Sequence, residues 1–309
     1  MTPATGAAAL PSNLTEEHEF PFLGAEVAVP YETARIVILP IPFERTTTYR
    51  QGCQHGPAAI LEASHQVEYY DDELAGEAFH AGIFTCGAIA DTRLNPNLTS
   101  EEMLAVTQSA TEVLIDDGKF VIALGGEHSI TEGIVAAYQQ RSGEPFTVVQ
   151  IDAHGDLRHE YEGSIHNHAC VMRRVVDMGI PTVQIGIRSL CREEAQLIRD
   201  QNLPILWARD IATQPDWMER AIAQIPTRNV FLTIDLDGID PALMPGVGTP
   251  EPGGLSWYGL LAFLKRLFDT HTVIGCDVME LAPVSDSVVS EFTAARLVYK
   301  LIGYQSGVK

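Results

Sequence analysis

The feature that most constrains the fold is a series of short apolar runs that alternate, after Pro30, with longer segments of helical period. Runs such as 148–151 and 230–234 are almost continuously apolar, which is typical of parallel strands covered by helices on both faces. The alternation predicts an α/β protein, a three-layer αβα sandwich on a mostly parallel sheet of about eight strands. The predicted strands are 35–41, 83–85, 120–124, 146–151, 182–187, 204–207, 230–234 and 272–276.

Helices are predicted between most of these strands from their apolar period and their end signals. Proline in the first turn of 57–66 and acidic residues in the first turn of 100–116 both favour a helix N-terminus. Further helices are predicted at 130–140, 192–200, 217–224, 256–268 and 288–303. Because no linker or internal repeat interrupts the pattern, we expect one domain over residues 31–309, preceded by an N-terminal arm over residues 1–30.

The charge balance excludes several classes of partner. The chain has 20 Lys and Arg residues against 41 Asp and Glu residues, so its formal net charge is −21 at pH 7. Phosphate backbones and anionic membranes would repel such a chain, whereas small cations would be attracted. We therefore expect no nucleic-acid or membrane partner.

Cysteine usage and the N-terminal sequence favour the cytoplasm. The five cysteines are odd in number, widely spaced and form no CxxC pair, which fits a reducing compartment better than a disulfide framework. Residues 1–24 have no basic segment followed by a long apolar one, so they do not resemble a secretory signal. No apolar run approaches the length of a membrane span.

Histidines and carboxylates follow four of the predicted strands directly. The sequence reads GGEHS after 120–124, DAHGD after 146–151, DLDGIDP after 230–234 and DVME after 272–276. Ligand crevices of open parallel sheets lie outside the carboxyl ends of the strands, so we expect these residues to share one rim. Residues two apart in an extended chain point to the same side, so Asp152, His154 and Asp156 are expected to face one point, as are Asp235 and Asp237.

Aspartates that emerge together from apolar strands would repel one another and lose hydration unless cations compensate them. Two divalent metals would match four such charges. A ligand set of oxygen and nitrogen without thiolate suits Mn²⁺ better than structural zinc, and leaves Fe, Co and Ni open. A two-metal site implies a bridging water that ionises near neutral pH and attacks carbon or phosphorus. The predicted ligands are His128, Asp152, His154, Asp156, Asp235 and Asp237.

Each motif taken alone has a simpler interpretation. Asp-rich loops are often turns, and a histidine is often a polar residue that only completes a hydrogen bond. The motifs occur together here, each directly after an apolar strand, and this combination favours the metal site.

At these residues the sequence resembles the ureohydrolase family, which includes arginase, agmatinase, guanidinobutyrase and formiminoglutamase. The resemblance extends from about Arg35 to Tyr304 and rests on five ordered motifs, GGEHS, DAHGD, HACVMRR, IDLDGIDP and CDVMELAP. It implies an arginase-like fold, a homotrimer or homohexamer, and two Mn²⁺ ions per subunit, with Asp152 and Asp235 bridging them. One ion would be held by His128, Asp152, Asp156 and Asp235, and the other by His154, Asp152, Asp235 and Asp237.

The resemblance also implies roles for two side chains that bind no metal. Glu280 would hold the substrate guanidinium through paired charge-assisted hydrogen bonds. A metal-activated water would attack the guanidinium carbon to give urea and an amine, and His168 would move a proton to that amine or to solvent. We interpret the nearby His166 as a loop residue, and Asp240 and Asp277 as residues that orient backbone or ligands.

Two departures from arginases favour agmatine as the substrate, with putrescine and urea as products. Arg158 stands where arginases carry an asparagine that reads the α-carboxylate, and Arg188-Ser189 resembles a loop of agmatinases. We also hypothesise that Glu160 or Glu162 attracts a cationic tail.

Several alternatives remain open. The same chemistry on 4-guanidinobutanoate, another guanidino acid or guanidine comes next, followed by the arginase and formiminoglutamase reactions. From other classes, the alternatives are a non-catalytic structural or binding protein on the same scaffold and an amide-cleaving metal hydrolase.

Overall fold

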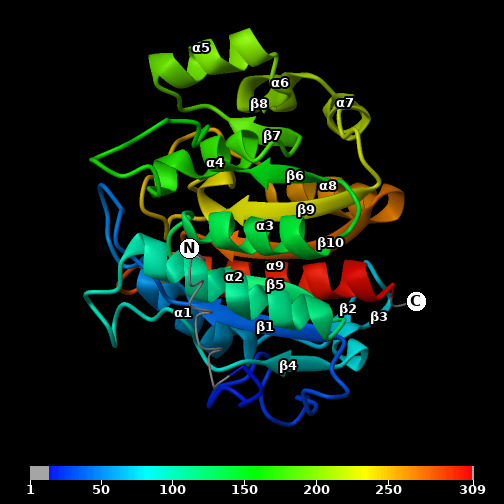
Figure 1. The fold of residues 1–309 in the computed structure, drawn as a ribbon. Helices are drawn as coiled ribbons and strands as arrows, with labels where there is room; N and C mark the ends of the chain where they lie inside the picture. Colours follow the sequence, from blue (N-terminus) through cyan, green and yellow to red (C-terminus); the bar gives the residue numbers. More distant parts are fainter. Residues whose placement is uncertain (1–13, 308–309) are drawn as a thin grey trace.

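An eight-stranded sheet forms the middle layer of the computed structural model, which describes residues 14–307 (Figure 1). The strand order is β4-β1-β5-β10-β9-β6-β7-β8, and every pairing is parallel. This confirms the predicted αβα sandwich. The strands are β1 (Ile36–Ile41), β4 (Ile83–Thr85), β5 (Phe120–Gly125), β6 (Phe146–Ile151), β7 (Thr182–Ile187), β8 (Ile205–Trp207), β9 (Asn229–Asp235) and β10 (Thr272–Met279).

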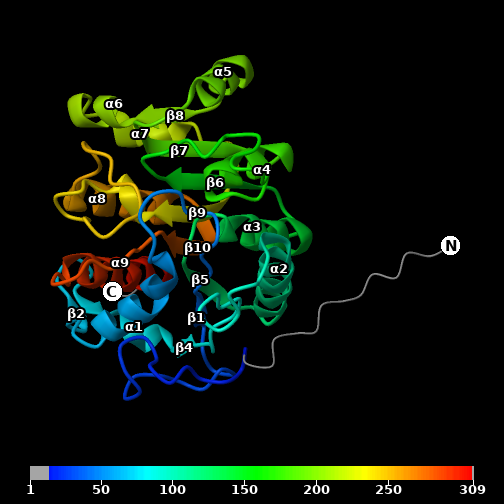
Figure 2. The same ribbon diagram turned by 90° about the vertical axis from the view of Figure 1, so that its left-hand side faces the viewer.

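Helices cover both faces of the sheet, as the view along its edge shows (Figure 2). One face carries α1 (Gly56–Ser64), α7 (Trp217–Ala223), α8 (Trp257–Thr270) and α9 (Val289–Ser306). The opposite face carries α2 (Ser100–Asp116), α3 (Ile130–Arg141), α4 (Val171–Asp177) and α5 (Arg192–Gln201). Within residues 14–307, no helix has the length and apolar character needed to cross a membrane.

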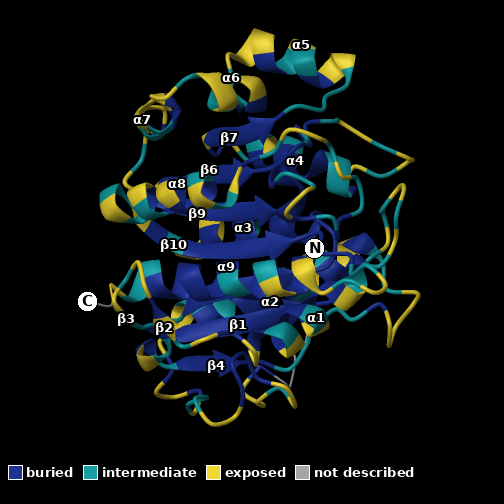
Figure 3. Ribbon diagram, turned by 180° about the vertical axis from the view of Figure 1, so that it is seen from behind, coloured by how far each residue is buried: buried dark blue, intermediate teal, exposed yellow. Residues whose placement is uncertain are grey.

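The side chains of each strand alternate between two apolar cores, one on each side of the sheet. In β1, Ile36 and Ile38 belong to one core, whereas Val37, Leu39 and Ile41 belong to the other. This is the two-residue period of an extended chain. Since both faces are covered, the central strands are buried along most of their length while the helices expose their outer sides (Figure 3). Coverage of both faces by helices explains why the strand sequences are continuously apolar.

N-cap residues lie at the predicted starts of two of the helices. Thr99 and Glu102 form a capping box at the start of α2, in which the Thr99 hydroxyl accepts the Glu102 N–H at 3.2 Å and the Glu102 carboxylate accepts the Thr99 N–H at 2.9 Å. The Ser256 hydroxyl likewise accepts the Gly259 N–H at 3.2 Å before α8. Such caps satisfy N–H groups that have no partner inside the helix.

Several short elements were not predicted. They include α4, the helix α6 (Ala208–Thr213), and a separate hairpin of β2 (Tyr70–Asp71) and β3 (Gly76–Glu77). Elements of one or two turns carry too little apolar period to stand out from loops. A predicted strand end was also wrong, because β10 continues to Met279 and so places Asp277 inside the strand.

The described part of the predicted N-terminal arm packs against the domain. Glu17 pairs with Cys86 and Ala28 with Ile83 through isolated bridges, so the arm runs along the β4 edge of the sheet. Phe22 and Leu23 are buried in the core beside α1. Residues 1–13 of the predicted arm lie outside the described residues. The division into an arm and one domain stays a prediction.

The sheet order places the four sequence motifs side by side. Strands β5, β10, β9 and β6 are consecutive neighbours in the middle of the sheet. All are parallel, so their carboxyl ends meet at one edge. GGEHS begins at the last residue of β5, DAHGD follows β6, and the DLDGIDP and DVME motifs begin inside the last residues of β9 and β10. The predicted common rim is therefore present.

Candidate metal centre

A pocket of about 220 Å³ opens at this rim. Its walls come from the loops after β1, β6, β7, β9 and β10 and from the first turn of α5. The predicted site residues that line it are His154, Asp156, His168, Asp235, Asp237 and Glu280. His128 and Asp152, also predicted ligands, lie beneath them and are fully buried.

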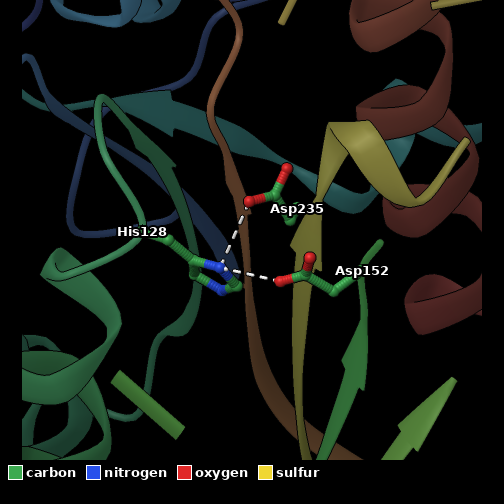
Figure 4. Close-up of side chains that lie close together, drawn as sticks. All are labelled: His128, Asp152 and Asp235. Atoms are coloured by element: carbon green, nitrogen blue, oxygen red, sulfur yellow. Dashed lines mark ion pairs between the residues drawn. The ribbon is translucent and has the colours of Figure 1, made fainter. Parts of the chain in front are cut away.

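The first cluster of predicted ligands surrounds His128 (Figure 4). Its Nδ1 atom lies 3.1 Å from Oδ2 of Asp152, 3.2 Å from Oδ2 of Asp156 and 3.3 Å from Oδ2 of Asp235. Yet Nδ1 of His128 makes no hydrogen bond to any residue from 14 to 307. A buried nitrogen without a partner, faced by three carboxylates, is an arrangement that a cation would complete.

The second cluster centres on His154. Its Nδ1 atom lies 2.9 Å from Oδ2 of Asp237 and 3.7 Å from Oδ1 of Asp152. Asp152 thus turns one oxygen to each histidine, as a bridging ligand would. Asp235 turns Oδ2 to His128, while its Oδ1 accepts the Asp237 N–H at 2.8 Å. The bridging role of Asp235 stays a prediction.

Backbone geometry, rather than strand alternation, brings the DAHGD side chains together. Strand β6 ends at Ile151, and the chain turns at Asp156, where φ is 53°. The expectation that Asp152, His154 and Asp156 share one side of an extended chain was therefore wrong. Asp152 is held by the His154 N–H at 2.6 Å and by the Gln150 side-chain amide at 2.6 Å, and these bonds aim its two oxygens.

A chain of hydrogen bonds orients His128. Its Nε2 lies 2.8 Å from the Thr233 hydroxyl, which donates to Asp277 at 2.7 Å, and Thr131 donates to the other Asp277 oxygen at 2.9 Å. Because the only hydrogen of the Thr233 hydroxyl goes to Asp277, Nε2 of His128 must be the donor in its contact with Thr233. The lone pair of Nδ1 then faces the three carboxylates, as a metal ligand requires.

The pKa values of the clustered residues indicate that the site lacks positive charge. Burial and the neighbouring carboxylates raise the pKa of Asp152 to about 8 and hold that of Asp235 well above its usual range. Burial opposes protonation of His154, but Asp237 outweighs it and raises the pKa of His154 to about 11. The residues alone would thus hold protons at neutral pH. Divalent cations would take the place of those protons, so the residues fit a pair of metal ions.

Glu280 lies directly after β10 and turns into the pocket. Its φ of 68° is unusual for a residue with a side chain, and it turns the chain at the end of the strand. Oε1 accepts the His128 N–H at 2.8 Å, and the Glu280 N–H donates to the carbonyl of Gly126 at 2.8 Å. Burial, together with Asp235, raises the pKa of Glu280. A carboxylate in this position could bind a cationic group of a ligand in the pocket.

The structure separates the two histidines of the third motif. His168 begins the short 3₁₀ helix η3 (His168–Cys170) and lines the pocket. His166 is not among the lining residues, and its Nδ1 lies 2.9 Å from a carboxylate oxygen of Glu132. Burial lowers the pKa of His168, which keeps its ring neutral near pH 7. Such a ring is suited to proton transfer.

Other residues singled out from the sequence lie away from the pocket. Glu160 and Glu162 are exposed and do not line it. The Arg188 guanidinium donates to the carbonyls of Asp237 and Glu251, each at 2.7 Å, so it braces the loop after β9. Asp240 accepts backbone N–H groups at 2.9 and 3.2 Å, in agreement with its interpretation as an orienting residue.

Sequence reasoning missed several residues of the pocket wall. Glu194 lines the pocket from α5 and accepts the Leu157 N–H at 2.9 Å and the Cys191 N–H at 2.7 Å. Tyr161 also lines the pocket and stacks on Arg158, a lining residue that the sequence did single out, with 4.4 Å between the guanidinium carbon and the ring centroid. The acidic first turn of α5 was a signal for Glu194. Nothing in the sequence marked Tyr161.

Comparisons with known proteins agree with this geometry. A model described as the arginase family matches residues 34–303. The N(1)-aminopropylagmatine ureohydrolase of Synechocystis sp. is 57% identical over 92% of this chain and 93% of its own length. The enzyme of the same name from Thermus thermophilus is 35% identical over 90% of this chain and 92% of its own. Among solved structures, the agmatine ureohydrolase of Thermoplasma volcanium has a TM-score of 0.82 at 31% identity and covers 94% of this chain and 95% of its own.

Proposed function

The chain belongs to the arginase family, and from this premise we propose that it is a binuclear manganese ureohydrolase that acts on a guanidino-alkylamine. The substrate we favour is N(1)-aminopropylagmatine, whose hydrolysis gives urea and spermidine. Agmatine, the substrate expected from the sequence motifs, is the second candidate, with putrescine as its product. Both reactions would belong to polyamine synthesis.

The observation that carries the substrate choice is the similarity to the Synechocystis enzyme. At 57% identity over 92% of this chain, that relative is much more similar than the agmatine ureohydrolase of Thermoplasma volcanium at 31%. The two candidate substrates share the guanidinobutyl part and differ only in an aminopropyl extension, so the same metal centre would serve both. The lining carboxylates that are not proposed metal ligands are those of Glu194 and Glu280, and they would be the acceptors for the cationic groups of either substrate.

His128, Asp152, Asp156 and Asp235 would hold one ion, and His154, Asp152, Asp235 and Asp237 the other. When bound, the ions would neutralise the buried carboxylates and activate water as the nucleophile. The side chains of the pocket would do the rest. Glu280, fixed by the His128 N–H at 2.8 Å, would orient the planar guanidinium by charge-assisted hydrogen bonds. His168, which is neutral near pH 7, would first accept a proton from the attacking water and then pass it to the departing nitrogen, which must be protonated to leave as a neutral amine.

The test is urea release by the Mn²⁺-loaded protein, ranked by kcat/KM on N(1)-aminopropylagmatine, agmatine, arginine, 4-guanidinobutanoate and guanidine. We expect the aminopropyl compound to lead, with agmatine next. Agmatine in first place would keep the mechanism and overturn the substrate choice. Absence of urea from every compound with Mn²⁺, Fe²⁺, Co²⁺ or Ni²⁺ would favour a non-catalytic protein.

Assembly of the subunits is a separate proposal. The ureohydrolase resemblance implies a homotrimer or homohexamer. Sedimentation equilibrium would test it, since a chain of 33.7 kDa would give about 100 or 200 kDa for the two assemblies.

A further inference from the structure

We propose that Thr46 and Glu127 are positioning residues that fix the tautomer of His168, so that the proton of its neutral ring sits on Nδ1 and Nε2 receives the proton in the reaction. The inference rests on the proposed function, in which His168 transfers a proton. It concerns two residues that do not line the pocket and that belong to neither ligand cluster. Three loops far apart in the sequence build the arrangement.

The Thr46 hydroxyl has all of its hydrogen-bonding capacity in use. It donates to Oε1 of Glu127 at 2.7 Å and accepts the main-chain N–H of His168 at 3.0 Å. Its third neighbour is Nδ1 of His168, at 3.2 Å. A hydroxyl has one hydrogen and two lone pairs. Because the hydrogen goes to Glu127, the contact with Nδ1 is a hydrogen bond only if Nδ1 carries the proton.

Glu127 determines which way the hydrogen of the Thr46 hydroxyl points. Its side chain is fully buried and accepts four hydrogen bonds: from the Arg45 N–H at 2.5 Å, the Thr46 N–H at 2.6 Å, the Thr46 hydroxyl at 2.7 Å and the Ser129 hydroxyl at 2.5 Å. Two of these donors are backbone N–H groups, which cannot reverse. A carboxylate that receives four donors acts as an acceptor only, so the Thr46 hydrogen points to it.

These hydrogen bonds determine which nitrogen of the His168 ring is free to act as a base. With its proton on Nδ1, the neutral ring of His168 presents Nε2 as a base. Across the described part of the chain, no hydrogen bond occupies Nε2, whereas Nδ1 is held by Thr46. A ring with the opposite tautomer would place a lone pair against the lone pairs of Thr46 and would lose this hydrogen bond. The ring would then also lack a free nitrogen to accept a proton in the pocket.

A similar arrangement of carboxylate, threonine and histidine occurs at His128, which is a proposed metal ligand. Asp277 orders the Thr233 hydroxyl, which in turn accepts from Nε2 of His128 at 2.8 Å and leaves Nδ1 free for a metal. In both cases a buried carboxylate orders a threonine hydroxyl, and the hydroxyl selects which histidine nitrogen keeps its lone pair. The selected nitrogen is Nδ1 in His128 and Nε2 in His168.

A spectroscopic experiment tests the tautomer without substrate or metal. Histidine rings of the metal-free protein are labelled with ¹⁵N, and the His168 signals are assigned by their loss in His168→Ala. Long-range proton–nitrogen correlations then show which ring nitrogen carries the proton. We expect protonated Nδ1 in the parent and in Thr46→Ser, and a loss of this preference in Thr46→Val, which keeps the volume but removes the hydroxyl. A parent ring protonated on Nε2 would overturn the proposal.

Steady-state kinetics tests the consequence for the reaction. In the Mn²⁺-loaded protein, Thr46→Val should lower kcat of urea release about 10- to 100-fold with KM changed less than about 3-fold, because Thr46 does not line the pocket. Thr46→Ser should restore kcat to within about 3-fold of the parent. Equal losses in the two variants would overturn the proposal, as would full activity of Thr46→Val. If the parent itself released no urea, the proposed function would fail, and the ¹⁵N experiment alone would still decide the tautomer.

Discussion

The hydrogen-bond chain behind His128 predicts that Thr233→Val weakens metal binding although it substitutes none of the proposed ligands. Thr233 is fully buried in β9, and valine matches its shape but has no hydroxyl. The substitution removes the 2.8 Å contact to Nε2 of His128 and the 2.7 Å hydrogen bond to Asp277. The His128 ring then has no partner that selects its tautomer, and one oxygen of a buried carboxylate loses its hydroxyl donor.

The expected size follows from these two losses. A buried acceptor deprived of its donor costs about 1–3 kcal/mol of stability. With an unfolding entropy of about 2.1 cal/mol/K per residue over 309 residues, that cost lowers Tm by about 2–5 °C. Loss of a partner that orients a ligand typically weakens metal affinity about 10- to 100-fold, or about 1.4–2.7 kcal/mol.

The assay is titration of Mn²⁺ into the metal-free protein, followed by the electron paramagnetic resonance signal of the free ion, with Tm measured in parallel. Thr233→Ser keeps the hydroxyl and should bind Mn²⁺ nearly as the parent does. Thr111→Val is the control for burial, because the Thr111 hydroxyl is buried in α2 and makes no hydrogen bond to any residue from 14 to 307. Parental affinity in Thr233→Val would refute the reasoning, whatever happens to Tm.

Three further predictions concern protons, stability and thiol chemistry. Mn²⁺ binding at pH 7 should release protons and strengthen as pH rises, because the pKa of Asp152 is about 8 and that of His154 about 11 without metal; calorimetry whose binding heat is the same in every buffer would contradict this. Lys300→Met should lower the free energy of unfolding in urea by about 2 kcal/mol, since it removes a buried partner 2.7 Å from the buried Asp71 and leaves Arg296, at 3.2 Å, as its cation, and adding Asp71→Asn should recover part of the loss. Ellman's reagent should modify Cys191 alone in the native protein, because the other four thiols are buried; a second rapid equivalent would show that the core opens.

Much of the fold follows from local patterns, but the order of the strands does not. The strands at 83–85, 146–151 and 182–187 begin and end where the sequence predicts, because turn residues bound their apolar runs. That β5, β10, β9 and β6 lie side by side depends on pairings between distant segments, about which hydrophobic period says nothing. The prediction that the motifs share one rim did not depend on the order of the strands, because it followed from their parallel direction alone.

The candidate ligands were recognisable by residue type, whereas the residues that orient them were not. Thr233 lies 105 residues from His128, and Thr46 lies 122 residues from His168. A threonine inside an apolar strand is ordinary β-sheet sequence, so nothing distinguished Thr233 from its neighbours. Asp277 was predicted to lie beyond its strand because a charged residue is not expected inside a buried strand. The two threonine hydroxyls that donate to its carboxylate, which make that position possible, could not be seen in the sequence.

The left-handed backbone at Asp156 and Glu280, with φ of 53° and 68°, has a consequence for laboratory evolution. A residue with a side chain costs about 1–2 kcal/mol in this region, and glycine avoids most of that cost. Selection for heat tolerance alone would therefore reward glycine at Asp156 and discard a proposed metal ligand, whereas glycine at Glu280 would also leave the buried His128 N–H without its acceptor at 2.8 Å. A library meant to yield a more robust catalyst has to hold these two codons constant, or be scored on urea from the first round.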